Sequence, residues 1–425
     1  MRKLMFLVAS FAALVAVPCL AQDQKFVPRS IAFTGAPEFT KSELMAAAHL
    51  HAKDALTVAE MREHASVLLD TGLFEKVSFT FTGVDLAYQL KSFTELLPAQ
   101  MPNLPPLEGL DMEASLRASV PLYHGRVPAD GGLCDQVRAA MEQILATKGI
   151  QATVVAAANA GAAAKVQLAM NYSITSPQVQ LGKIAVDPAS GSLDPAVLQI
   201  LKHLEGTPYD AGGTPSQIAT YVTNYYHDAG YLEALANPHQ QGTATVAADA
   251  INVPFTVAVT PGPLYRLNAI HLDPSIPEPQ SDFNKKAALH PGDIARGQQL
   301  TQSWEFLARQ YHNQGFMSPS IRPEPVFDRS KATVEFNVTA TPGPVYTMGK
   351  LTLENVTEEL RTAFLAAWPL RAGAIYNEGQ ARGFFATQNV HPELERIFAT
   401  ATVRYEQIQN DDAHTVDLVV KMVRK

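Results

Sequence analysis

The residues that could do chemistry are few and scattered along this chain of 425 residues. His49 and His51 lie two positions apart and His64 follows, a set that could bind a metal ion if the three rings converged. Residues two apart on a helix point to different sides, so solvated histidines are the better interpretation. Asp411 and Asp412 could form an acid pair, but they stand where a hairpin loop favours Asn and Asp for backbone reasons. Neither set predicts a catalytic or metal-binding site.

Motifs of common enzymes are absent from the sequence. It has no Gly-x-Ser-x-Gly elbow, no His-Glu-x-x-His helix, no phosphate-binding Gly-rich loop and no Cys pair for a metal. Cys134 has no acid–base partner near it in sequence and is predicted to be a small buried residue. We expect a non-enzymatic protein without cofactor or metal, with an exported hydrolase as an alternative. Two aromatic groups have the spacing of a buried helical stripe and are predicted to pack in cores: Tyr221, Tyr225 and Tyr226, and Trp304, Phe306 and Tyr311.

Composition predicts a folded, acidic protein of several domains. Apolar residues make up 47% and charged residues 17%, so the chain can bury enough surface to fold. The formal charge is −8, from 33 Lys and Arg against 41 Asp and Glu, and no basic run stands out. Nucleic acid is therefore excluded as the expected partner.

The first residues have the pattern of a secretory signal peptide. Arg2 and Lys3 form a basic start, and Leu4–Val17 is an apolar stretch that is short of the roughly 20 residues of a membrane-spanning helix. We expect a signal peptide over residues 1–21 and an exported product. Cleavage would leave Cys134 as the single cysteine, so an internal disulfide is excluded.

Two kinds of repeated sequence predict a tandem architecture. Thr-Pro-Gly-Pro-Leu-Tyr at 260–265 matches Thr-Pro-Gly-Pro-Val-Tyr at 341–346, an offset of 81 residues, and each hexad lies between two alternating strand patterns. The second signal is a helix that ends in Gly followed by an apolar residue, which is typical of a C-cap. Intervals of 77, 81 and 85 residues separate these caps, at Gly72, Gly149, Gly230 and Gly315. One unit copied along the chain explains both signals.

The unit reads as strand, helix, helix, strand, strand, with both helices on one face of a three-stranded sheet. This predicts an α+β fold. The second unit offers little for a first helix between Pro121 and Gly132, and the fifth has 388–392 where a Gly cap would fall. The predicted units span residues 26–92, 103–172, 178–261, 263–342 and 344–425.

The first unit resembles the POTRA (polypeptide-transport-associated) domain of outer-membrane assembly proteins. The similarity lies in 30–35, 39–44 and 70–77, and the Pro-Gly-x-x-Tyr openings at 261–265 and 342–346 resemble POTRA junctions. In the insertases of that family, such an array precedes a membrane β-barrel. This chain ends at Lys425, soon after the last predicted strand, so we expect an array without a barrel.

The resemblance implies a binding role for one sheet edge of each unit. In POTRA domains the strand after the second helix is commonly exposed and can add a strand from a client polypeptide. We therefore expect a periplasmic accessory of outer-membrane protein assembly or transport in a Gram-negative bacterium. Its expected partners are outer-membrane β-barrel proteins, unfolded clients or a separately encoded barrel, with only peripheral membrane association. A scaffold that holds fixed envelope partners is the alternative. The predicted partner-binding residues are Glu75, Lys76, Val77, Ser78, Phe79, Tyr231, Leu232, Glu233, Met317, Ser318, Val403 and Tyr405.

Overall fold

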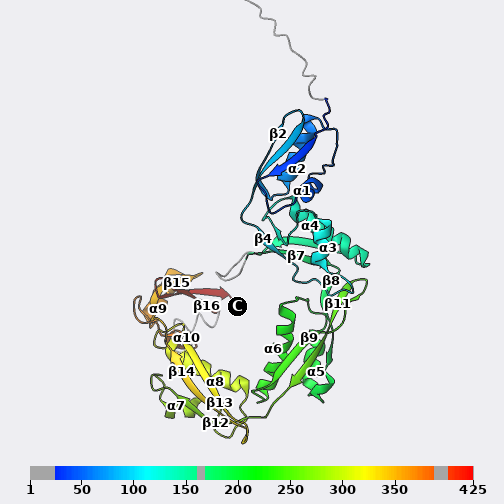
Figure 1. Ribbon diagram of the computed structural model, residues 1–425. Helices are drawn as coiled ribbons and strands as arrows, with labels where there is room; N and C mark the ends of the chain where they lie inside the picture. The colour runs from blue at the N-terminus through cyan, green and yellow to red at the C-terminus, as the bar shows by residue number, and fades with distance from the viewer. Residues whose placement is uncertain (1–23, 160–167, 387–400, 425) are drawn as a thin grey trace, which may run out of the picture. The chain divides into compact units, whose positions relative to one another are not determined.

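The computed structural model describes residues 24–159, 168–386 and 401–424. Their strands form five sheets that follow one another along the chain and define repeats 1 to 5 (Figure 1). The predicted α+β fold of small sheets with two helices each is confirmed. The chain divides into two compact units, and the boundary between them runs through repeat 3. The predicted signal peptide lies outside the described residues.

Repeat 1 shows how local sequence sets the order of elements. Each helix begins with a capping box, in which a Thr side chain and a Glu side chain bond to each other's backbone N–H: Thr40 with Glu43, and Thr57 with Glu60. The first and last strands pair in parallel, which requires a long crossover that the two helices supply. The middle strand in sequence pairs antiparallel with the last, so the last strand is central. The elements are β1 (Ser30–Thr34), α1 (Lys41–Ala47), α2 (Val58–Asp70), β2 (Phe74–Phe81) and β3 (Asp85–Ser92).

Repeat 2 differs from the prediction at its beginning. Its first strand lies before residue 103, and its first helix lies at Met112–Ser119, where Asp111 provides the N-cap by accepting from Ala114 at 3.0 Å. This helix is only eight residues long, and its two buried apolar residues are Met112 and Leu116. A two-residue strand extends the predicted three-stranded sheet to four, in the order β5-β4-β7-β6. The elements are β4 (Leu97–Gln100), α3 (Met112–Ser119), β5 (Arg126–Val127), α4 (Gly132–Thr147), β6 (Thr153–Ala158) and β7 (Met170–Ser176).

Repeat 3 also has four strands, in the order β10-β11-β8 with β9 pairing β11. Its central strand contains Pro254, which cannot donate a ladder bond. The register with β8 shifts between Val253 and Phe255, so the proline sits at an irregularity, the place where a central strand tolerates it. The elements are β8 (Gln178–Val186), a 3-10 turn (Pro188–Ser190), α5 (Pro195–Leu204), α6 (Gly213–Asp228), β9 (Leu235–Gln240), β10 (Thr245–Val246) and β11 (Ala250–Thr260).

Repeats 4 and 5 restore the three-stranded pattern of repeat 1, with orders β12-β14-β13 and β15-β17-β16. Each encloses its own core: in repeat 4, Leu307 of the second helix and Val334 of the central strand are fully buried together. The repeat 5 segment expected to lack a cap, 388–392, lies outside the described residues. The elements are β12 (Arg266–Leu272), α7 (Gln280–Lys286), α8 (Gly297–His312), β13 (Ser320–Asp328), β14 (Thr333–Thr341), β15 (Thr347–Glu354), α9 (Glu358–Ala367), α10 (Glu378–Ala386), β16 (Ala401–Asn410) and β17 (Thr415–Arg424).

No helix in the described part of the chain has both the length and the apolar character needed to cross a bilayer.

Candidate partner-binding edges

In repeats 3, 4 and 5 the loop between the two helices closes the outer edge of the first strand. In repeat 4, Leu267 donates its N–H to the carbonyl of Asp293 at 2.9 Å, and Gly292 donates to the carbonyl of Leu267 at 2.8 Å. A strand edge whose N–H and C=O groups are paired cannot accept another chain at that point. The equivalent bonds join Leu181 to Thr207 and Gly206 in repeat 3, and Met348 to Ala374 and Gly373 in repeat 5.

Side chains extend this closure along the same strands. In repeat 4, Leu272 donates its N–H to Gln280 Oε1 at 2.8 Å, and Gln280 Nε2 donates to the carbonyl of Ile270 at 2.9 Å. In repeat 3, Ile184 donates its N–H to Glu205 Oε1 at 3.1 Å. An amide or carboxylate side chain thus takes the place of a neighbouring strand, and the first-strand edges of these repeats are not available for strand addition.

The opposite edges belong to the strands that follow the second helix. β2, β13 and β16 are terminal strands of their sheets, each paired on one side only. Among the described residues, no hydrogen-bond partner outside the ladder reaches the backbone of these three strands. β6 is also terminal, but Val154 donates its N–H to Glu142 Oε1 at 2.8 Å, which closes the start of that edge. Open backbone is therefore concentrated in β2, β13 and β16.

The predicted partner-binding residues of repeats 1 and 5 lie in these terminal strands. Glu75, Lys76 and Tyr405 are exposed to solvent, whereas the other four are half-buried. Whether they contact a partner stays a prediction. They are Glu75, Lys76, Val77, Ser78 and Phe79 in β2, and Val403 and Tyr405 in β16.

For repeats 3 and 4 the prediction placed the strand too early. β9 begins only at Leu235 and β13 only at Ser320, so Tyr231, Leu232, Glu233, Met317 and Ser318 precede the strands. The second residue after each Gly cap has a different role, because Leu232 packs against the core of repeat 4 and Met317 against the core of repeat 5. These residues lie where one repeat joins the next, and whether they contact a partner stays a prediction.

The two sequence signals of the repeat meet at these junctions. Tyr265, which ends the first hexad, donates its N–H to the carbonyl of the cap residue Gly230 at 2.9 Å. Tyr346, which ends the second hexad, donates in the same way to Gly315 at 2.8 Å. Both tyrosines are buried, and their hydroxyls donate to acidic side chains: Glu233 and, at 2.9 Å, Asp411 of the β16–β17 turn. The Gly cap and the Pro-Gly-Pro turn are therefore two halves of one joint.

A charged clamp reinforces the joint between repeats 3 and 4. Arg329 donates from Nε to both carboxylate oxygens of Glu233, at 3.2 and 3.1 Å, and also from Nη2. The hydroxyl of Tyr265 donates to the same carboxylate. The hydrogen bonds from Arg329 and then from Tyr265 lower the pKa of Glu233 to about 2. Glu233 remains ionised at neutral pH and holds the β13–β14 turn against the end of repeat 3.

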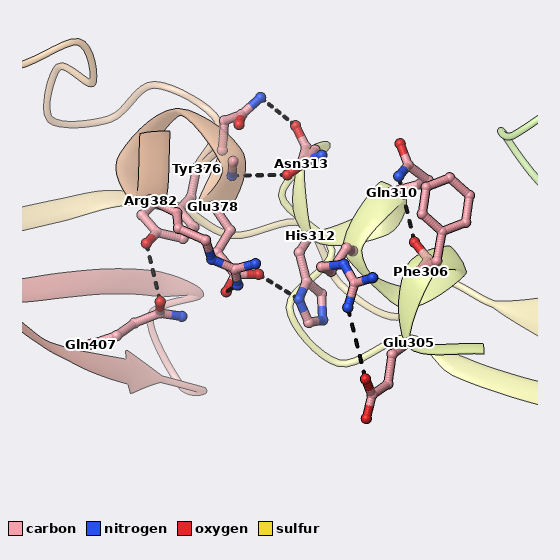
Figure 2. Close-up of polar contacts among 12 residues, drawn as sticks. Glu305, Phe306, Gln310, His312, Asn313, Tyr376, Glu378, Arg382 and Gln407 are labelled. Atoms are coloured by element: carbon pink, nitrogen blue, oxygen red, sulfur yellow. Dashed lines mark hydrogen bonds and ion pairs between the residues drawn. The ribbon is translucent and has the colours of Figure 1, made fainter. Parts of the chain in front are cut away.

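The joint between repeats 4 and 5 connects the end of α8 to the start of α10, as Figure 2 shows. Asn377 Nδ2 donates to the carbonyl of Asn313 at 2.7 Å, and Gly379 donates its N–H to Asn313 Oδ1 at 2.8 Å. Beside them His312 Nδ1 lies 2.6 Å from Glu378 Oε2. These bonds satisfy the free carbonyl and N–H groups at the two helix ends, which otherwise lack partners.

The residues that could do chemistry have structural partners. His64 Nδ1 lies 2.7 Å from the carbonyl of Ala48, and Cys134 Sγ donates to the carbonyl of Pro128 at 3.1 Å. Burial raises the pKa of the Cys134 thiol, although the residue is half-buried rather than fully buried as predicted. Within residues 24–159, 168–386 and 401–424, no three His, Cys, Asp or Glu side chains come together in a group that could hold a metal ion.

The aromatic groups pack largely as predicted. Tyr226 and Tyr311 are buried, and Trp304 and Phe306 pack against the core of repeat 4. The prediction is wrong for Tyr221, which is half exposed on α6. The neighbouring positions on that helix meet the core, and Tyr221 lies on the side turned away from it.

Comparison with known families identifies one repeat directly. The POTRA family, described as "Surface antigen variable number repeat", matches residues 276–343, which include α7, α8, β13 and β14. Residues 276–343 are a POTRA repeat. Repeats 1 and 5 have the same strand order and pairing directions as repeat 4, so these three repeats share one topology.

Several solved structures are similar to parts of this chain. The crystal structure of Haemophilus influenzae BamA POTRA3-5 is 18% identical, covers 58% of this chain and 96% of that one, and has a TM-score of 0.39. POTRA1-3 of the periplasmic domain of Omp85 from Anabaena is 15% identical, covers 59% and 97%, and has a TM-score of 0.25. CdiB from Acinetobacter baumannii is 18% identical, covers 39% and 30%, and has a TM-score of 0.20. Because all three TM-scores are below 0.5, the likeness to POTRA domains rests on the family match and on the strand order.

Proposed function

We propose that this chain is a periplasmic, non-enzymatic POTRA-repeat protein that serves outer-membrane protein assembly or transport. It binds extended segments of client or partner polypeptides by strand addition. Its partners are outer-membrane β-barrel proteins, unfolded clients or a separately encoded barrel, and it meets the membrane only peripherally. The family match of residues 276–343 supports this proposal.

The observation that carries the proposal is the contrast between the two edges of each sheet. First-strand edges in repeats 3, 4 and 5 are closed by the helix–helix loops and by Gln280 or Glu205. The strands that follow the second helix, β2, β13 and β16, form the second-strand edges. Among the described residues, their backbones have no hydrogen-bond partner on the outer side. An edge strand that is left open in a folded protein is a template for another chain, because the backbone supplies the bonds and client sequence can vary.

The magnitudes indicate weak, reversible binding. Four added ladder bonds contribute roughly 2 to 6 kcal/mol at about 0.5 to 1.5 kcal/mol each. Ordering each client residue costs about 1 to 2 kcal/mol, so a single edge binds weakly. Two or more edges on one chain raise the effective concentration of a long client, which explains the use of a repeated unit.

Amide hydrogen exchange tests strand addition. A ten-residue strand peptide from an outer-membrane β-barrel protein is added at millimolar concentration to the mature chain. We expect slower exchange in at least one second-strand edge and unchanged exchange in β12, whose edge is closed. Unchanged exchange in all the second-strand edges would overturn the proposal.

The structured joints favour a second function, a scaffold that holds fixed envelope partners. The clamp between Glu233 and Arg329 and the bonds between Asn313 and Asn377 set one repeat against the next, as a spacer requires. Pull-down from an envelope extract separates the two functions. A scaffold retains one partner in constant stoichiometry, whereas a client-binding protein retains many outer-membrane proteins in small amounts.

A further inference from the structure

The open edges are not chemically equal, because one of them carries proline. β13 contains Pro323 and Pro325, two positions apart. β2 and β16 contain no proline. Proline has no backbone N–H, so each one removes a donor that an added strand would need.

The register shows which side of β13 has lost its donors. Pro323 pairs with Val338 and Pro325 with Phe336 of the central strand β14, and the ladder continues without a shift from Ser320 to Asp328. Proline within a sheet is confined to positions whose missing N–H points away from the neighbouring strand. Positions 323 and 325 therefore face the free edge. Because N–H direction alternates along a strand, this edge lacks two consecutive outward donors.

The corresponding positions of β16 keep their donors. On the central strand of repeat 4, Val338 lies between Pro323 and Leu272; on that of repeat 5, Val420 lies between Tyr405 and Leu353. Tyr405 thus occupies the register position of Pro323. By the same comparison Gln407, opposite Leu418, occupies that of Pro325. The outward N–H groups of β16 are intact.

β2 has the same intact arrangement. Phe79 and Phe81 pair with Tyr88 and Leu86, which on their other side pair with Phe33 and Ile31 of the first strand. Phe79 and Phe81 therefore face the free edge of the sheet, as the two prolines of β13 do. Unlike the prolines, both phenylalanines have a backbone N–H.

The side chains of the two intact edges indicate the kind of segment that fits. In β16, Val403 packs against the core of repeat 5, and the next residue on that face, Tyr405, stacks on Phe385 with ring centroids 4.3 Å apart. Arg404 and Glu406 lie on the opposite face and are exposed. An added strand continues both faces, so it needs apolar residues facing the helices and polar residues facing solvent.

The same alternation occurs in β2. Val77, Phe79 and Phe81 are half-buried, with Phe79 and Tyr88 ring centroids 6.0 Å apart, whereas Lys76 and Thr80 on the other face are exposed. Each edge leaves its apolar layer incompletely covered, which a client's apolar side chains would complete.

We propose that extended clients with alternating apolar and polar residues add to β2 and β16, and that Pro323 and Pro325 exclude them from β13. The inference rests on the proposed function and specifies its sites: repeats 1 and 5 accept strands, and the POTRA repeat at 276–343 does not.

Replacing the two prolines tests whether they exclude clients from β13. The expected result is a gain of peptide binding, which misfolding of the variant would not produce. The probe is a nine-residue peptide of alternating Val and Thr with a Lys at each end, mixed with the mature chain. In the wild type we expect amide exchange to slow in β2 and β16 but not in β13. In the variant Pro323→Thr/Pro325→Thr, which restores both outward donors, β13 should gain protection. Glu324→Thr is the matched control, because it changes the same strand without adding an outward N–H and should leave β13 unprotected.

The reverse change tests β16. Tyr405→Pro/Gln407→Pro should weaken peptide binding there about tenfold or more, since two hydrogen bonds are lost. Tyr405→Ala/Gln407→Ala keeps both N–H groups and should retain most of the binding. If the proline variant fails to fold, the gain of protection in Pro323→Thr/Pro325→Thr decides by itself.

The outcomes separate the inference from the proposed function. Protection of wild-type β13 equal to that of β16 overturns the inference but leaves strand addition standing. Absence of gain in Pro323→Thr/Pro325→Thr, with β2 and β16 protected, also overturns it. No protection in any strand of any variant overturns strand addition as a whole.

Discussion

His312 and Glu378 face each other across the joint between repeats 4 and 5, with Nδ1 and Oε2 2.6 Å apart (Figure 2). His312 lies in the last turn of α8, where the helix dipole favours a cation, and Glu378 lies in the first turn of α10, where it favours an anion. Arg382, one turn further along α10, bonds to the same carboxylate. One side-chain pair thus links the ends of two helices that belong to successive repeats.

We expect this joint to weaken in acid. The hydrogen bond from His312, followed by the charge of Arg382, holds the pKa of Glu378 below its ordinary value. A carboxylate whose pKa is lower in the folded state contributes stability above its unfolded pKa of about 4.3 and loses that contribution as pH falls through the folded value. Glu378→Gln should lower the free energy of unfolding of repeat 5 by about 1 to 2 kcal/mol at pH 7. At pH 3, below the unfolded pKa, the difference from the wild type should be smaller than at pH 7.

Denaturant unfolding at the two pH values, followed by exchange of repeat 5 amides, measures this effect. Glu305→Gln is the control, because Glu305 forms only an exposed pair with Arg309 at 3.8 Å and should change stability little. An equal loss of stability at pH 7 and pH 3 in Glu378→Gln would contradict the assignment.

The Gly caps predict a difference between joints. Gly315 and Gly149 both have positive φ, 87° and 79°, so Ala at either position costs about 1 kcal/mol of backbone strain. A Cβ on Gly315 would lie 2.7 Å from Ile375 Cγ2 and 3.0 Å from the carbonyl oxygen of Tyr346, whereas a Cβ on Gly149 would meet nothing within 4 Å. Gly315→Ala should therefore destabilise by about 1 to 3 kcal/mol more than Gly149→Ala. Thermal unfolding of the two variants side by side gives the comparison, and equal costs would show that the cap does not touch repeat 5.

The clamp between Glu233 and Arg329 should hold repeats 3 and 4 at a fixed distance. Arg329→Met removes every bond of the guanidinium to Glu233, so spin labels at positions 221 and 326, with Cys134 replaced by Ser, should give a broader distance distribution. Since the pKa of Glu233 is lowered to about 2, the wild-type distribution should stay narrow above the ordinary carboxyl range and broaden as pH falls toward 2.

Lys331→Met is the control for this measurement. Lys331 pairs with Asp328 within its own hairpin, at 2.9 Å, and should leave the distance unchanged. An unchanged distribution in Arg329→Met would show that the clamp does not fix the joint.

Separate cores predict that the repeats lose stability separately. Leu307 is fully buried in the core of repeat 4, so Leu307→Ala should cost about 2 to 5 kcal/mol there. In a repeat array, damage is felt mainly by the altered unit and its neighbours. Native-state hydrogen exchange should show faster opening of α8 and β14 with repeat 1 unaffected, and Leu365→Ala, at an exposed position, should change neither. Uniform loss of protection through all repeats would indicate a single cooperative core.

How far the fold could be predicted depends on the range of the interactions involved. Gly72, Gly230 and Gly315 could be identified as helix ends because positive φ and a following apolar residue are local requirements. Their spacing and the hexads ending at Tyr265 and Tyr346 were enough to predict the repeat. The first helix of repeat 2 was missed, because it lies at Met112–Ser119, before the segment from Pro121 to Gly132 in which a first helix was expected.

The candidate edges were harder to predict for the same reason. The sequence by itself determined that Glu75–Phe79 form a strand and that Val403 and Tyr405 lie in another, since their alternation is local. Only the tertiary structure decided which edges are closed, because the bonds of Leu267 with Asp293 and with Gly292 join residues far apart in sequence. It also placed Leu232 in the core of the following repeat. Caps and alternation act within a few residues, whereas the closing of an edge depends on which distant backbone groups the fold brings within hydrogen-bond distance.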